Sequence, residues 1–242
     1  MESEQPIPET SSIEKTPPRP APTEAYSWRV FSSNARISYI TDILQAETEL
    51  SAIQPGPLGF DLEWKPNYRK GGAENPVALV QLANNQAIFL IQISTIRAFP
   101  DKLREILGRH DFLKAGVGIQ GDTQKLFKDW GVSVNNCVEL GMLARTVDNA
   151  RWKGKYVAPI GLARLVEVYH YRLLEKGKIR RSNWEAVLDE SMQNYAANDA
   201  HAGYTLYQHL IQMVDPSDVA QFLWFTLASP ESGLRPWPST PS

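Results

Sequence analysis

Short runs of apolar residues alternate with helix-spaced apolar residues along the middle of the chain. The apolar runs predict strands over residues 37–40, 58–64, 77–82, 87–93 and 113–117, and a short one near Val138. The helix-spaced residues predict a helix after Thr41, which would cap it, and helices over residues 100–107 and 122–130. Gly131 closes the last of these, and mostly helical sequence follows to about Ala228.

The order of these elements indicates the fold class. Asn84 and Asn85 separate the strands at 77–82 and 87–93, so those two strands are expected to form a hairpin. Strands come first, then strands and helices alternate, and helices dominate at the end. This order predicts an α/β fold in which helices pack on a central mixed β-sheet.

Both ends of the chain differ in composition from the middle. Proline, serine, threonine and glutamate dominate residues 1–26, and proline recurs through residues 229–242. Segments with so few apolar side chains cannot bury enough surface to offset their chain entropy, so both ends are predicted to be disordered tails. The folded domain is expected at residues 27–228, a length that suits one sizeable core.

Overall charge and cysteine content narrow the class of protein. The net charge is −2 and the sequence pI is about 6.1, so any nucleic-acid contact must come from local basic patches. Cys137 is the only cysteine, which excludes an internal disulfide and a cysteine-rich zinc site. No apolar run reaches the roughly 20 residues of a membrane span. We therefore expect an intracellular protein without a membrane partner, and nuclear residence would suit a role in DNA repair.

The first candidate site is the pair Asp61 and Glu63 in the second predicted strand. Side chains alternate along a strand, so both carboxylates are expected on one face and Phe60, Leu62 and Trp64 on the other. An isolated pair of this kind also fits an edge strand with a solvated acidic face. Beside a buried strand, however, two like charges are costly unless a cation neutralises them. Mg²⁺ and Mn²⁺ prefer carboxylate oxygen, so the pair is interpreted as half of a divalent-metal site.

The second candidate is Asp122, which follows a glycine-rich turn. On its own, an aspartate at a predicted helix start is most simply a cap. The turn Gly116-x-Gly118-x-x-Gly121 also matches the spacing of the dinucleotide-binding fingerprint, with Glu139 downstream. That fingerprint normally lies in the first strand–helix unit, and here it comes late in the order of elements. A dinucleotide-dependent enzyme stays open as a competing hypothesis.

The third candidate lies in the last long helical stretch. Tyr195 and Asp199 are four residues apart, so they share one face of a helix and can address one site. Upstream, residues 176–184 form the densest basic cluster of the chain. Beside an acidic metal site, Lys178 and Arg180 are expected to hold substrate phosphates. Each feature taken alone also fits an ordinary surface.

Taken together and in order, these stretches resemble the three motifs of the DEDD 3′–5′ exonucleases. They are Phe-Asp-Leu-Glu-Trp at 60–64, Val-Gly-Ile-Gln-Gly-Asp at 117–122, Arg-x-Ser-Asn-Trp at 180–184 and Tyr-Ala-Ala-Asn-Asp-Ala at 195–200. The tyrosine four residues before the last aspartate resembles the pattern of the DEDDy branch. Within this branch, the motifs are most similar to those of the exonuclease domain of the Werner syndrome protein. The resemblance covers roughly residues 37–212, nearly the whole expected domain.

The resemblance implies a fold, a reaction and roles for individual residues. The fold would be RNase H-like, with a mixed β-sheet flanked by α-helices. Four carboxylates would bind two divalent cations, Mg²⁺ or Mn²⁺, namely those of Asp61, Glu63, Asp122 and Asp199. Tyr195 would orient the attacking water. The reaction would release nucleoside 5′-monophosphates one by one from a free 3′ end of DNA or RNA.

The hypothesis also assigns substrate contacts, and one alternative class of function competes with it. Lys178 and Arg180 are assigned to the substrate phosphates, and Leu62 and Trp64 are expected to pack near the substrate. The alternative is a catalytically silent nucleic-acid-binding or scaffold module on the same fold. Clustered carboxylates repel phosphate and binding alone does not need them, so the sequence favours the enzyme. It indicates no particular protein partner.

Overall fold

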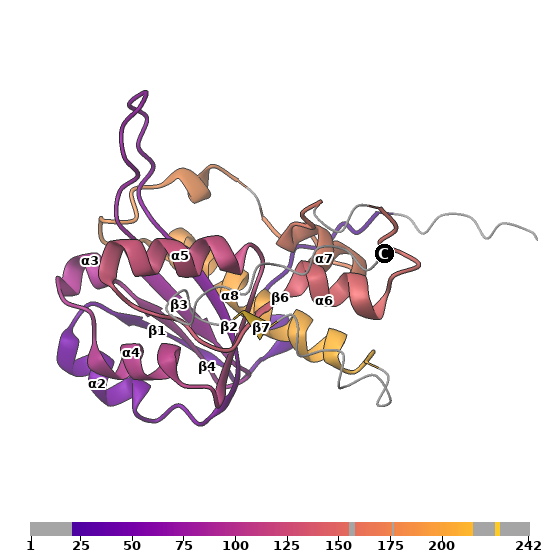
Figure 1. Cartoon of the computed structure of the whole chain (residues 1–242), viewed down its shortest axis with the longest axis horizontal. Coiled ribbons are helices and arrows are strands. Elements are labelled where there is room, and N and C mark those ends of the chain that lie inside the picture. Colours follow the sequence, from indigo (N-terminus) through magenta and orange to yellow (C-terminus); the bar gives the residue numbers. More distant parts are fainter. Residues whose placement is uncertain (1–20, 155–157, 176, 215–225, 228–242) are drawn as a thin grey trace, which may run out of the picture.

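A computed structural model describes residues 21–154, 158–175, 177–214 and 226–227. In this part of the chain, a seven-stranded mixed sheet has the order β1-β4-β3-β2-β5-β6-β7 (Figure 1). Its strands are β1 (Arg36–Ile40), β2 (Gly56–Glu63), β3 (Leu79–Ala83), β4 (Ala87–Ile91), β5 (Phe112–Gly116), β6 (Cys137–Glu139) and β7 (Thr226–Leu227). Strand β2 is antiparallel to β3 and parallel to β5, so it occupies the centre of the sheet.

Helices cover both faces of the sheet. They are α1 (Trp28–Phe31), α2 (Ile43–Leu50), α3 (Ile93–Ile96), α4 (Asp101–Gly108), α5 (Ile119–Trp130), α6 (Leu140–Val147), α7 (Leu162–Tyr169), the 3₁₀ helix η1 (Lys178–Arg181) and α8 (Glu190–Ile211). In Figure 1, α2, α4 and α5 lie in front of the sheet and α8 lies behind it. None of the described helices is long and apolar enough to cross a bilayer. The arrangement confirms the predicted fold class, and β3 and β4 form the expected hairpin.

Alternation along the central strands divides the core into layers. Phe60 and Leu62 of β2 pack with residues of α2, α4 and α5. Leu79 and Leu90, from β3 and β4, pack on the opposite face beneath α8. Because Asp61 alternates with Phe60 and Leu62, its side chain faces the α8 layer.

Helix α8 lies directly on the backbone of β2 and β5. A Cβ atom on Gly59 would be 1.9 Å from the carbonyl oxygen of Ala200, and one on Gly203 would be 2.9 Å from that of Ala115. Glycine has no side chain that would keep these backbones apart. The two glycines therefore set the depth at which α8 sits over the end of β2.

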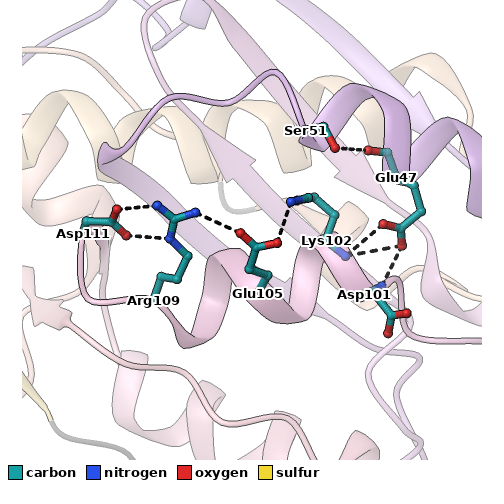
Figure 2. Close-up of polar contacts among 7 residues, drawn as sticks. All are labelled: Glu47, Ser51, Asp101, Lys102, Glu105, Arg109 and Asp111. Carbon is teal, nitrogen blue, oxygen red and sulfur yellow. Dashed lines mark hydrogen bonds and ion pairs between the residues drawn. The ribbon is translucent and has the colours of Figure 1, made fainter.

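A polar network fastens α4 on the other face of the sheet (Figure 2). The carboxylate of Glu47, on α2, accepts hydrogen bonds from the backbone N–H groups of Asp101 at 2.7 Å and Lys102 at 3.0 Å. These N–H groups are free donors at the start of α4, so a neighbouring helix supplies its cap. At the other end, Arg109 pairs with Asp111 on the surface. Such an exposed pair adds little to stability, whereas the cap fixes α4 relative to α2.

Two predicted helix starts and the expected C-terminal structure need correction. Asp42, not Thr41, caps α2, because its carboxylate is the one that accepts hydrogen bonds from backbone N–H groups of the first turn. Helix α5 begins at Ile119 instead of Asp122, because Gly118 adopts a φ of +75° and ends the turn after β5 earlier. The expected helical structure does not extend to Ala228, because Thr226–Leu227 form strand β7, which pairs with β6.

Residues 24–26 contact the domain, although the sequence placed them in a tail. Ala25 forms a parallel bridge with Leu173, and the Tyr26 N–H donates to the carbonyl oxygen of Leu173 at 2.8 Å. The Tyr26 hydroxyl lies 2.8 Å from Nδ1 of His201 on α8. The rest of the expected tail at 1–26 is mostly outside the described residues, and the expected tail at 229–242 is entirely outside them.

Gly59→Ala is expected to lower the free energy of unfolding by about 3 kcal/mol or to prevent folding. The added methyl group would meet the backbone of α8, which cannot yield as a flexible side chain would. Urea denaturation followed by circular dichroism measures the change. Gly108→Ala is the control, because its added Cβ has no atom within 4 Å and should change stability by no more than about 1 kcal/mol. Equal effects of the two changes would contradict the close approach.

Candidate active site

The C-terminal end of β2 brings two carboxylates to the face beneath α8. Asp61 and Glu63 alternate along this strand with Leu62, which is buried in the opposite layer. Helix α8 supplies a third carboxylate from Asp199. Oxygen atoms of these three groups all lie within 4.8 Å of one another. The acidic face predicted for the strand is therefore completed from a helix distant in sequence.

Asp122 reaches the same cavity from the first turn of α5. The cavity has a volume of about 570 Å³, and Asp61, Glu63, Asp122, Tyr195 and Asp199 all line it. Among the described residues, the group of oxygen atoms within 4.8 Å of one another does not include Asp122. The structure thus brings all five predicted residues to one cavity, with Asp122 set apart from the other carboxylates.

Burial raises the pKa of each of the four carboxyl groups, and repulsion from neighbouring carboxylates adds to this effect for Glu63, Asp122 and Asp199. Desolvation raises the pKa of Asp61 to about 7. Desolvation, followed by repulsion from Asp61 and Asp199, raises the pKa of Glu63 to about 10. The pKa values of Asp122 and Asp199 also lie well above their usual range, with desolvation as the main cause. A bound cation is the kind of charge that would allow all four to be ionised together at neutral pH.

Tyr195 is fixed beside this cluster by a hydrogen bond and by packing. Its hydroxyl donates to the Asp199 carboxylate one helical turn further along α8. The ring of Tyr195 packs against Trp184, which is fully buried, with ring centroids 6.1 Å apart. Burial raises the pKa of Tyr195 above its usual value, so the phenol stays neutral at the cavity.

The basic side of the cavity comes from η1. Arg180 and Arg181 both line the cavity. The positive charge of Arg180 acts on Glu63 and Asp199, where it lowers their pKa values against the larger effect of burial. Lys178 is exposed and does not line the cavity. Of the two basic residues expected to hold phosphate, the structure brings only Arg180 to the cavity.

Leu62 and Trp64 line the cavity and also contact the core. Nζ of Lys125 lies 4.7 Å from the centre of the Trp64 ring. Lys125 is itself nearly buried and pairs with Asp129 at 3.0 Å. The tryptophan is therefore held in a fixed position at the edge of the cavity.

The glycine-rich turn serves a purpose other than dinucleotide binding. The backbone N–H groups of Gly118 and Ile119 donate to the carboxylate of Glu139 at 2.7 and 3.1 Å. A dinucleotide phosphate would have to bind at this same helix N-terminus. Because a carboxylate of the chain already occupies it, the structure does not support the dinucleotide hypothesis.

Three residues near the carboxylates were not among those predicted. Arg181 follows Arg180 in the basic cluster and could have been included for that reason. Glu139 helps to raise the pKa of Asp122 by repulsion. Gln81 is paired with Asp61 across β2 and β3, and its fully buried amide has no hydrogen-bond partner among the described residues. In the sequence, Gln81 is a polar residue within an apolar strand, and this contrast could have marked it as a candidate.

Most of the chain matches a known protein family. A model described as a 3′–5′ exonuclease matches residues 36–215, well over half of the chain. The chain belongs to the 3′–5′ exonuclease family. This match confirms the resemblance inferred from the four motif stretches, and it covers the elements that carry the carboxylates.

Two curated relatives also support membership of the exonuclease family. The chain is 39% identical over 165 residues to the bifunctional 3′–5′ exonuclease/ATP-dependent helicase WRN of Mus musculus, covering 67% of this chain and 11% of that protein. It is 31% identical over 194 residues to a 3′–5′ exonuclease of Arabidopsis thaliana, covering 78% of this chain and 64% of that protein. The chain thus spans less than two thirds of the length of both relatives.

Solved structures of exonucleases share the fold. The EXO domain of Aedes aegypti Nibbler superposes with a TM-score of 0.66 at 23% identity, covering 81% of this chain and 98% of that one. Escherichia coli RNase D superposes with a TM-score of 0.62 at 19% identity, covering 78% of this chain and 47% of that one. At these identities the likeness concerns the fold, and it confirms the RNase H-like, DEDD-type fold expected from the sequence.

The metal-free exonuclease domain is expected to lose stability as pH rises from about 4 toward 10. Asp61 and Glu63 bind protons more tightly in the folded state, so their contribution is complete below an unfolded pKa of about 4. It is lost as pH rises through about 7 for Asp61 and about 10 for Glu63. Thermal unfolding in chelator at a series of pH values measures the slope of stability against pH.

Two variants test which carboxylate causes this slope. Glu63→Gln should flatten it, because the substitution removes the group whose pKa is raised to about 10. Glu105→Gln, at an exposed position on α4, should leave the slope over neutral and alkaline pH unchanged. A Glu63→Gln protein with the slope of the unaltered protein would contradict the assignment.

Proposed function

We propose that this chain is a metal-dependent 3′–5′ exonuclease, which hydrolyses the terminal phosphodiester bond of DNA or RNA and releases nucleoside 5′-monophosphates. The observation that carries the proposal is the convergence of four buried or half-buried carboxylates and Tyr195 on one cavity with arginines at its edge. Membership of the 3′–5′ exonuclease family supports the class of reaction.

The carboxylates suit two divalent cations, Mg²⁺ or Mn²⁺. Three of them offer oxygen atoms within 4.8 Å of one another, and burial raises the pKa of all three. Bound cations would relieve this cost of ionisation. When bound, such cations would activate the attacking water and stabilise the departing 3′ oxygen. We assign Asp61, Glu63, Asp122 and Asp199 as the residues that would hold these cations, with Asp61 on the central strand of the sheet.

The remaining side chains would position the reactants. Tyr195, whose hydroxyl is held by Asp199, would orient the attacking water as a neutral hydrogen-bonding group. Arg180, which lines the cavity, would neutralise a substrate phosphate. Leu62 and Trp64 would pack near the terminal nucleoside, since they line the cavity beside the carboxylates.

A catalytically silent nucleic-acid-binding module on the same fold is the competing proposal. Phosphate binding alone is weakened by buried carboxylates, because they repel the ligand. This chain keeps four carboxyl groups in one cavity and adds a tyrosine bonded to one of them. That combination favours an enzyme.

Asp61→Ala is expected to abolish cleavage, because it removes a central carboxylate of the proposed cation site. Tyr195→Phe should reduce the rate by about 10-fold to 100-fold, because the carboxylates remain and only the orientation of water is lost. The assay uses a 5′-labelled 3′-recessed DNA duplex and a matched single-stranded RNA, each with Mg²⁺, with Mn²⁺ and with chelator. A metal-dependent ladder that shortens from the 3′ end is the expected product pattern.

Two results of this assay would change the proposal. Near wild-type cleavage by Asp61→Ala would rule out the assigned mechanism. A folded wild-type protein that produces no ladder with either metal would favour the silent binding module. The relative rates on the two substrates also rank DNA against RNA.

Arg180→Ala is introduced into an Asp61→Ala background, which is expected not to cleave. It should weaken binding of single-stranded nucleic acid, and the slope of log binding constant against log salt concentration should fall by the equivalent of about one phosphate contact. Fluorescence anisotropy at several salt concentrations measures both quantities. Lys178→Ala should have a smaller effect, because Lys178 does not line the cavity. Arg36→Ala, on the exposed edge strand β1, is the charge-matched control. An unchanged salt slope for Arg180→Ala would remove Arg180 from the phosphate path.

A further inference from the structure

The connection between β2 and β3 projects from the edge of the cavity. We call residues 65–76 the β2–β3 arm; it is the narrow purple loop that extends beyond α5 in Figure 1. Trp64 immediately before it, and Pro66 within it, line the cavity of the carboxylates. At its far end, Tyr68 is 78% exposed, and Arg69 and Lys70 beside it are exposed as well.

Internal hydrogen bonds give the arm a defined shape. The side-chain amide of Asn75 donates to the carbonyl oxygen of Lys65 at 2.8 Å, which joins the two limbs at the base. The amide of Asn67 donates to the carbonyl oxygen of Ala73 at 2.7 Å, which joins them again further out. Beyond that point the chain reverses through Gly71, whose φ of +74° suits glycine. The arm is therefore a braced structure.

The base of the arm is also anchored to the body of the domain. Nζ of Lys125, on α5, donates to the carbonyl oxygen of Asn75 at 2.9 Å and lies 3.5 Å from the Glu74 carboxylate. The same ammonium group sits over the Trp64 ring at the cavity edge. On the other limb, Lys65 pairs with Glu185 at 3.4 Å. Bracing and anchoring hold the far end of the arm at a set position relative to the cavity.

The far end itself carries exposed side chains. The side chains of Tyr68, Arg69 and Lys70 have no hydrogen bond or ion pair with any other described residue. An exposed aromatic ring offers a stacking surface for a base, and two unpaired cations attract phosphates. This combination matches single-stranded nucleic acid better than it matches an acidic protein surface, which would leave the ring unused.

We propose that the β2–β3 arm binds the nucleic-acid strand a few nucleotides upstream of its 3′ terminus. The inference rests on the proposed function, because it takes the 3′ terminus to lie in the cavity. Tyr68 stacks on a base, and Arg69 and Lys70 contact the backbone of the same strand. The arm therefore adds affinity only for substrates long enough to extend out of the cavity.

Substrate length provides the test. Two arm variants are compared with the wild type, Tyr68→Ala and the double change Arg69→Ala with Lys70→Ala. One substrate is the p-nitrophenyl ester of thymidine 5′-monophosphate, a single nucleotide that cannot reach the arm. The other is a labelled strand of roughly 20 nucleotides, long enough to pass over it. Arg36→Ala combined with Lys128→Ala, both exposed and outside the arm, is the charge-matched control.

Each arm variant is expected to lower kcat/KM on the long strand by about fivefold to tenfold, the range expected for loss of one stacked base or two phosphate contacts. Hydrolysis of the ester should stay within about twofold of the wild-type rate, because the catalytic cavity is unchanged. The control should match the wild type on both substrates. Equal losses on the ester and the strand, or no loss on the strand, would overturn the proposal.

Binding separates this inference from the proposed function. The dissociation constant of the long strand is measured by fluorescence anisotropy in chelator, where no cleavage is needed. The arm variants should raise it about fivefold to tenfold and the control should not. Failure of the wild type to hydrolyse either substrate would overturn the exonuclease proposal, whereas equal dissociation constants for the arm variants and the wild type would overturn the role of the arm.

Discussion

The candidate site depends on the contact between the backbones of α8 and β2. Gly59 lets α8 approach until a single added carbon atom would collide with the carbonyl oxygen of Ala200. The next residue toward the N-terminus of α8 is Asp199, so this approach brings its carboxylate beside those of Asp61 and Glu63. Tyr195 lies one turn earlier on the same helix. One contact between two backbones therefore places groups from both elements in a single cavity.

That contact is maintained against electrostatic repulsion. Apolar residues on the same face of the sheet, such as Leu79 and Leu90, pack against α8 and hold the helix over the acidic strand end. The carboxyl groups beneath it repel one another when they ionise, because burial increases the repulsion between like charges. A ligand of opposite charge that binds only the folded chain would shift the folding equilibrium toward it. Stability and ligand binding are thus coupled through the same few carboxyl groups.

Periodicity and motif order predicted the fold class and the residues around the cavity, because both are properties of short stretches. The alternation of Asp61 with Leu62 needs no knowledge of the partner strands. The depth of α8, in contrast, follows from a contact between residues about 140 positions apart, which periodicity does not encode. The exposure of Lys178 and the burial of Gln81 likewise depend on tertiary packing. The start of α5 differs from the one that the sequence predicts, because Gly118, and not an aspartate, precedes its first turn.

The carboxylate of Glu139 at the start of α5 has a consequence for small anions. Backbone N–H groups at a helix start normally attract phosphate or sulfate, but here Gly118 and Ile119 are already bonded to Glu139. Gly118 and Ile119 therefore offer inorganic phosphate no free backbone donor. A phosphate group that enters the cavity would therefore have to be held by side chains such as Arg180, and not by the start of α5.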